Sequence, residues 1–169
     1  PQPVYFTSSD LERDVREAIG NSAQQVYPED LDGLTALDAS DSSITHLNGV
    51  QHCQNLVELD LGSNNIFEIS HLSNLTNIQN LNISSNHITD ITPVSSLTNL
   101  SRLNFRWNDV SNIEPVANLI NLKRLDFWGN RVTSLSPLEG LTDIQVLVLH
   151  ENQITDLSPI SELNNLTYL

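Results

Sequence analysis

Apolar residues recur at a fixed interval of 22 residues from residue 34 to the end of the chain. One apolar column comprises Leu34, Leu56, Ile78, Leu100, Leu122, Ile144 and Leu166. The columns that follow it extend the pattern to L-x-x-L-x-L-x-x-N-x-I, which occurs six times in register. A fixed period of this length indicates a solenoid, in which each repeat contacts only its neighbours.

Each column of the repeat predicts a local structure. The L-x-L alternation has the period of a strand, so both apolar side chains should point inward while the flanking residues face outward. The Asn column can donate and accept, so it can satisfy backbone groups of adjacent coils; it comprises Asn64, Asn86, Asn108, Asn130 and Asn152, with Ser42 in the first coil. Proline lacks a backbone donor and fixes φ, so a short 3₁₀ or extended segment is expected at Pro93, Pro115, Pro137 and Pro159.

Residues 1–33 do not follow the repeat and predict an N-terminal cap. Ser9 and Glu12 form an S-x-x-E capping box, and a helical apolar face follows, formed by Leu11, Val15, Ala18 and Ile19. Gly20 is a natural helix stop, and Pro28 suggests a second short helical turn. We therefore expect a cap at 1–33 and repeats at 34–169, with six full coils and the start of a seventh. The chain begins at Pro1 without any methionine and stops mid-repeat, so we expect a trimmed or partial product.

These features together predict an α/β solenoid: a right-handed coil with a concave parallel β-sheet, convex 3₁₀ or extended segments and a helical cap. The repeats resemble those of bacterial internalin-type leucine-rich-repeat proteins. The resemblance rests on N-H-I-T-D-I-T-P-V at 86–94, L-T-N-L at 97–100 and N-Q-I-T-D-L-S-P-I at 152–160. In the cap it rests on Phe6, the L-x-x-x-V-x-x-x-I helix and D-L-x-x-L-T-x-L-D-A at 30–39. Intracellular phosphatase-regulator repeats share the 22-residue period, but the proline column and the cap favour the bacterial type.

The resemblance implies a protein-interaction scaffold that is secreted or attached to a bacterial surface. Such a module would act like an adhesin and bind a protein of a host or neighbouring cell, but no ligand residue of the family can be transferred. Two alternatives remain: an accessory binding module of a larger surface enzyme, and a carbohydrate-binding module.

The charge balance narrows the partner class. With 21 acidic and 7 basic residues, the chain has a net charge of -14, which argues against nucleic acid and anionic membranes as general partners. No apolar run approaches the roughly 20 residues of a membrane helix, so we expect no membrane insertion.

Nothing in the chain predicts catalysis, a cofactor or a metal site. The single cysteine, Cys53, occupies a core leucine column and excludes an internal disulfide. The histidines occupy five different repeat positions, at His46, His52, His71, His87 and His150. They cannot stack into a metal site, and no nucleophile or phosphate loop is present. We therefore predict a protein that is not an enzyme.

One stretch of the outward strand face stands out as a binding site. Five of the seven basic residues fall in two adjacent coils, together with both tryptophans. Tryptophan and arginine are common interface hot spots, so we predict a ligand-contact centre formed by Arg102, Arg106, Trp107, Arg124, Trp128 and His150. Glycan and other anionic ligands remain possible there.

A structural alternative is that Trp128 stacks on Arg106 while Asp126 and Glu151 neutralise the arginines. The binding interpretation instead places the Trp128 side chain outward, so that its removal should barely affect stability. The first coils differ in charge and carry Asp38, Asp41, Glu58 and Asp60.

Overall fold

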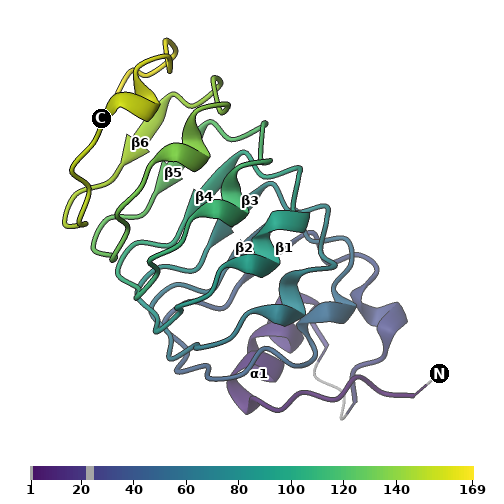
Figure 1. The fold of residues 1–169 in the computed structure, drawn as a ribbon. Helices are drawn as coiled ribbons and strands as arrows, with labels where there is room; N and C mark the ends of the chain where they lie inside the picture. Colours follow the sequence, from purple (N-terminus) through teal and green to yellow (C-terminus); the bar gives the residue numbers. More distant parts are fainter. Residues whose placement is uncertain (1, 22–24) are drawn as a thin grey trace.

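The computed structural model describes residues 2–21 and 25–169, so Pro1 and residues 22–24 of the predicted cap lie outside the described residues. Six strands of three residues each form one parallel sheet in chain order. They are β1 (Ala36–Asp38), β2 (Glu58–Asp60), β3 (Asn80–Asn82), β4 (Arg102–Asn104), β5 (Arg124–Asp126) and β6 (Val146–Val148). Partners in the register are 22 residues apart, as in Leu37 with Leu59. The two ends of the chain lie at opposite ends of the solenoid (Figure 1).

The side of each coil away from the strands is a short 3₁₀ helix, as predicted (Figure 1). The prolines of the repeat column occupy the first turns of η4 (Thr92–Ser96), η5 (Glu114–Val116), η6 (Ser136–Leu138) and η7 (Ser158–Ile160). Two earlier coils form the same turn without proline, at η2 (Val50–His52) and η3 (Ser70–Leu72). The short coil itself therefore favours the 3₁₀ turn, and proline reinforces it.

The inward columns form one continuous apolar core from the cap to the last coil. Beneath the fourth and fifth coils, Phe105 and Phe127 stack with ring centroids 5.7 Å apart. The Asn column bridges coils as predicted: Asn86 Oδ1 accepts the Ile66 N–H of the preceding coil, and its amide donates to the Leu61 carbonyl. Buried backbone groups outside the sheet thus gain partners.

The cap contains α1 (Ser9–Ala18) and the short η1 helix (Pro28–Leu31). The predicted capping residue, Ser9, is wrong by one position: extended Ser8 is the N-cap, and its Oγ accepts the Leu11 N–H at 3.2 Å. Ser9 is already helical, so its hydroxyl does not have the geometry of a cap. Gly20 closes the helix at a φ of 64°.

The cap is joined to the first coil by close packing and by hydrogen bonds. Asn48 Nδ2 donates to the Tyr5 carbonyl at 2.7 Å. The Phe6 ring occupies the space where a Cβ at Gly49 would lie, so only glycine fits there. No helix in residues 2–21 and 25–169 is long and apolar enough to cross a membrane.

Candidate binding site on the concave strand face

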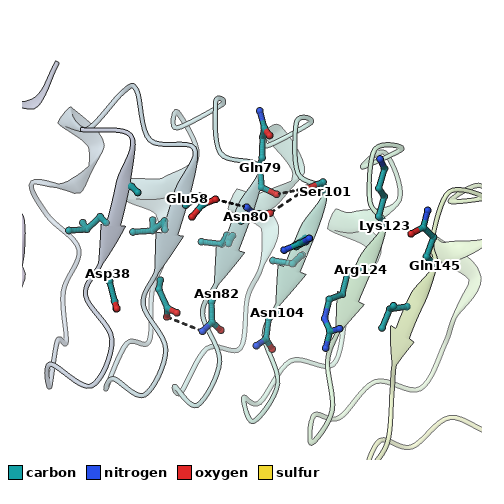
Figure 2. Close-up of a pocket in the computed structure, with 18 residues that line it drawn as sticks. Asp38, Glu58, Gln79, Asn80, Asn82, Ser101, Asn104, Lys123, Arg124 and Gln145 are labelled. Carbon is teal, nitrogen blue, oxygen red and sulfur yellow. Dashed lines mark hydrogen bonds between the residues drawn. The ribbon is translucent and has the colours of Figure 1, made fainter. Parts of the chain in front are cut away.

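A hollow of about 1070 Å³ lies over the outward face of the sheet. Figure 2 shows Asp38 and Glu58 at one end, amide side chains in the middle, and Lys123 and Arg124 toward the other end. The strands project these side chains because alternate residues of each strand face away from the core. The charge gradient noted in the sequence is therefore present on a single surface.

Two predicted site residues, Arg102 and Arg124, begin β4 and β5 and are partners in the register. Both are exposed and line the hollow. Their like charges on neighbouring strands are unfavourable without a counter-charge. The buried Asp126 provides one, since its Oδ2 lies 3.9 Å from Arg124 Nη2. No carboxylate of the described chain forms an ion pair with Arg102.

The turn that follows each strand has a repeated geometry. After the first five strands, the side chain of the last strand residue accepts the N–H two residues later, as Asn104 Oδ1 does from Arg106 and Asp126 Oδ1 from Trp128. The residue after that N–H donor adopts positive φ in all six coils, at Asp41, Ser63, Ser85, Trp107, Gly129 and Glu151. This conformation is uncommon outside glycine. It turns the chain at the end of each strand, and we call the row formed by these six turns the rim of the strand face.

Three of the predicted site residues form a row of neighbouring, mutually tilted rings on this rim, which we call the aromatic ladder. The rings of Trp107 and Trp128 have centroids 5.2 Å apart, and those of Trp128 and His150 are 5.7 Å apart. Gly129 makes room for the row, because a Cβ there would lie 2.5 Å from Trp107 Cε3. The ladder thus depends on a residue that carries no side chain of its own.

The position of Trp128 corrects the sequence-based interpretation. Its side chain is half-buried, and its Nε1 is enclosed without a hydrogen-bond partner in the described part of the chain. The expectation of a purely outward side chain is therefore wrong, and with this burial we expect the removal of the ring to reduce stability. The alternative stack on Arg106 is also wrong, since Trp128 lies against Trp107 and His150. Trp107 is the more accessible indole, at 44% exposure.

The predicted residues thus form two adjoining groups, the strand-face arginines and the aromatic ladder. Asp126 links them, because one carboxylate oxygen accepts the Trp128 N–H and the other lies near Arg124. Arg106 is exposed on the turn before Trp107. Lys123 also lines the hollow, although it was not among the predicted contact residues. Its position in the sequence, one residue before the outward-facing column that contains Arg124, could have identified it.

Other reactive groups lie apart from this surface. Cys53 is completely buried, and burial raises the pKa of its thiol to about 12. At the acidic end of the hollow, hydrogen bonds from the Ser40 hydroxyl and N–H lower the pKa of Asp38. No group of three or more His, Cys, Asp or Glu side chains within residues 2–21 and 25–169 could hold a metal ion.

Comparison with known proteins identifies the same architecture. The family model for "Leucine Rich repeats (2 copies)" matches residues 120–162, and that for a single "Leucine Rich Repeat" matches residues 77–97. None of the curated protein sequences matches the chain significantly.

Solved structures supply longer matches. Internalin InlF of Listeria monocytogenes is 32% identical over 98% of this chain and 51% of its own, with a TM-score of 0.95. Internalin C2 of the same species is 29% identical over 99% of this chain and 98% of its own, with a TM-score of 0.63.

A third structure is the leucine-rich-repeat ectodomain of the Arabidopsis thaliana receptor kinase GASSHO1/SCHENGEN3, in complex with CASPARIAN STRIP INTEGRITY FACTOR 2. It is 28% identical over 82% of this chain and 18% of its own, with a TM-score of 0.71. The chain spans about half the length of the InlF structure. With its 22-residue coils, its helical cap and these internalin relatives, the chain is a leucine-rich-repeat protein of the internalin type.

Proposed function

We propose that this chain binds a partner protein on its concave face, with Arg102, Arg124 and the aromatic ladder at the centre of contact. One observation carries the proposal: both indoles and the strand-face arginines gather on two adjacent coils and are linked by Asp126. Arg106 flanks the ladder and extends the same surface. Aromatic and arginine side chains of this kind dominate the binding energy of protein interfaces.

The rigidity of the surface supports a binding role. The arginines project from paired strands, and the ladder is held by turns of fixed conformation. A surface that is already ordered loses little conformational entropy when it binds. In this proposal the chain acts as an adhesin-like module, secreted or on a bacterial surface, and its partner is a protein of a host or neighbouring cell. The module performs no catalysis of its own.

A protein partner agrees better with the ladder than a glycan does. Neighbouring rings are tilted by 43° and 40°, so they offer no flat platform for successive sugar rings. The plant leucine-rich-repeat structure that resembles this chain is a complex with CASPARIAN STRIP INTEGRITY FACTOR 2, a peptide, and that precedent also supports a polypeptide partner.

The test is a selection from a displayed library of extracellular protein domains, followed by affinity measurements on variants. Trp128→Ala should weaken the selected binders by at least about 30-fold, which corresponds to roughly 2 kcal/mol for a hot-spot residue. The matched control is Phe67→Ala, because Phe67 is an exposed ring that stacks on His87 of the next coil away from the strands. Arg124→Ala should also weaken binding, whereas Arg131→Ala, which loses an exposed pair with Asp109, should not.

Because Trp128 is half-buried, circular dichroism must show that each variant is folded at the assay temperature. Trp128→Phe keeps a ring in the stack and should retain part of the affinity. If no domain is enriched, or if binders tolerate both Trp128→Ala and Arg124→Ala, the proposed contact centre is wrong.

A further inference from the structure

The hollow over the strand face is electrically bipolar, with unlike charges at its two ends. The acidic end carries Asp38, Glu58 and Asp60, on β1 and β2. The basic end carries Arg102, Lys123 and Arg124, at the starts of β4 and β5. The proposed contact centre uses only the basic end, so the acidic end remains unexplained by it.

The two ends do not neutralise each other. Neighbouring parallel strands lie about 4.8 Å apart, so Glu58 on β2 and Arg124 on β5 are separated by about 14 Å. This distance exceeds the Debye length of about 8 Å at physiological salt. Within the described residues, none of the three carboxylates at the acidic end forms an ion pair, and neither Arg102 nor Lys123 does.

The acidic side chains are nevertheless held in place by neutral donors. Asn80 Nδ2 donates to Glu58 Oε1 at 3.1 Å, and Asn82 Nδ2 donates to Asp60 Oδ1 at 2.9 Å. Figure 2 shows the Glu58–Asn80 pair between the acidic end and the middle of the hollow. These amides orient the carboxylates without cancelling their charge, so the attraction for a cation of a partner persists.

The middle of the hollow suits a polypeptide backbone. It carries the uncharged polar side chains Asn80, Asn82 and Asn104 on β3 and β4, with Gln79 and Ser101 beside them. Amide side chains can donate to a carbonyl and accept from an N–H. A segment whose charged groups reach the two ends would therefore place its uncharged backbone over this stretch.

We infer that the hollow binds a bipolar segment of a partner protein, with a basic group at the β1–β2 end and an acidic group at the β4–β5 end. The inference rests on the proposed function and specifies the chemistry of the partner. A separation of about 14 Å corresponds to about four residues of an extended chain or about nine of a helix. The peptide can satisfy this spacing in either chain direction, with its basic residue before or after its acidic residue in the sequence.

The experiment is a selection of phage-displayed random dodecapeptides on the immobilised chain. Enriched sequences should pair a basic with an acidic residue at a spacing near four or near nine, relative to the unselected library. Individual peptides are then measured by fluorescence anisotropy. Glu58→Lys and Arg124→Glu should each weaken a bipolar peptide about fivefold to tenfold, as expected for reversing one exposed charge contact. The loss should shrink in 0.5 M salt.

A change of binding specificity is a more stringent test than a loss of affinity. The double variant Arg102→Glu/Arg124→Glu makes both ends acidic, so it should prefer a peptide in which the acidic residue has been replaced by Lys. Arg131→Glu, away from the hollow, is the matched control and should leave peptide binding unchanged.

Three results would overturn the bipolar assignment: no enriched peptide, enrichment of peptides with charges of one sign only, or bipolar peptides insensitive to Glu58→Lys and Arg124→Glu. None of these results alone decides the proposed function, which is judged by the response of displayed domains to Trp128→Ala and Arg124→Ala. Conversely, domains that tolerate both Trp128→Ala and Arg124→Ala while bipolar peptides respond at Glu58 would reject the contact centre and keep the hollow.

Discussion

The buried Asn column offers a quantitative test of how the coils are held together, starting at Asn64. Asn64 Oδ1 accepts two N–H groups of the preceding coil, from Ser42 at 3.2 Å and Ile44 at 2.8 Å. Its Nδ2 donates to the Ala39 carbonyl, which has no other donor in the described chain. Asn64→Ala therefore leaves three backbone groups without partners.

Asn86 makes a similar number of hydrogen bonds, but its loss should cost less. Its Oδ1 accepts only the Ile66 N–H, at 2.9 Å. Its Nδ2 donates to three carbonyls, and each of these keeps another donor. The remaining donors are Asn64 Nδ2 to Leu61, Asn108 Nδ2 to Ile83, and the Ser63 N–H to Ser84. Asn86→Ala therefore orphans a single buried N–H group.

The magnitudes follow from the number of orphaned groups. A buried backbone group left without a partner costs about 1–3 kcal/mol. The free energy of unfolding should fall by about 1–3 kcal/mol for Asn86→Ala and by about 3–5 kcal/mol for Asn64→Ala, since the N–H of Ser42 is only part-buried. The larger loss is a substantial fraction of the roughly 5–15 kcal/mol typical of a domain.

Urea unfolding followed by far-UV circular dichroism gives the comparison. The control is Asn99→Ala, which removes an exposed donor to the Thr76 carbonyl and should change the free energy of unfolding by no more than about 0.5 kcal/mol. Equal losses for Asn64→Ala and Asn86→Ala would refute the reasoning, because they would show that total hydrogen bonds matter rather than orphaned groups.

Three further changes test the rim, the core and the charge state. Gly129→Ala should displace the Trp107 ring and cost about 1–2 kcal/mol through its positive φ; unchanged Trp fluorescence and stability would contradict this. Cys53 should resist thiol reagents at pH 8 until the chain unfolds, because burial raises its pKa to about 12; rapid labelling of the native protein would show otherwise. The pKa of Asp90 is lowered by hydrogen bonds from the Thr92 hydroxyl and N–H, so its ionised form stabilises the fold above its ordinary value of 3.8 and loses that effect as the pH falls through the lowered pKa. Asp90→Ala should therefore destabilise at pH 7 and not at pH 2, and an equal loss at both would contradict the assignment.

The core and the coil arrangement could be predicted because their chemistry repeats. Each inward leucine meets the same column in the next coil, and the Asn column has one donor and one acceptor in the right places. The helix start could not be fixed, because Ser8 and Ser9 both carry a hydroxyl and only the backbone conformation distinguishes them. The left-handed turn column was missed for a related reason: its members, such as Ser85, Trp107 and Glu151, share a φ angle but no side-chain chemistry.

The residues that form the candidate site could be predicted, but the packing of their side chains could not. The 22-residue period places Arg102 beside Arg124, and the register confirms that pair. The period does not show how far the rims of adjacent coils approach, and that distance decides the burial of Trp128. Its ring centroid lies 5.2 Å from that of Trp107 and 5.7 Å from that of His150, so neighbours on both sides cover a side chain that one repeat alone would leave exposed.

The fourth and fifth coils combine two unusual features that reinforce one another. Phe105 and Phe127 replace smaller residues of the inward column, and their rings stack within 13° of parallel beneath these coils. On the outside, Trp107 and Trp128 follow two residues after Phe105 and one residue after Phe127. A bulky, close-packed core limits movement of the backbone above it, so the rim that carries the indoles should be stiff. Binding to a stiff rim costs little ordering entropy, which explains why these two coils, rather than the Ser- and Asn-rich coils before them, are suited to carry the contact centre.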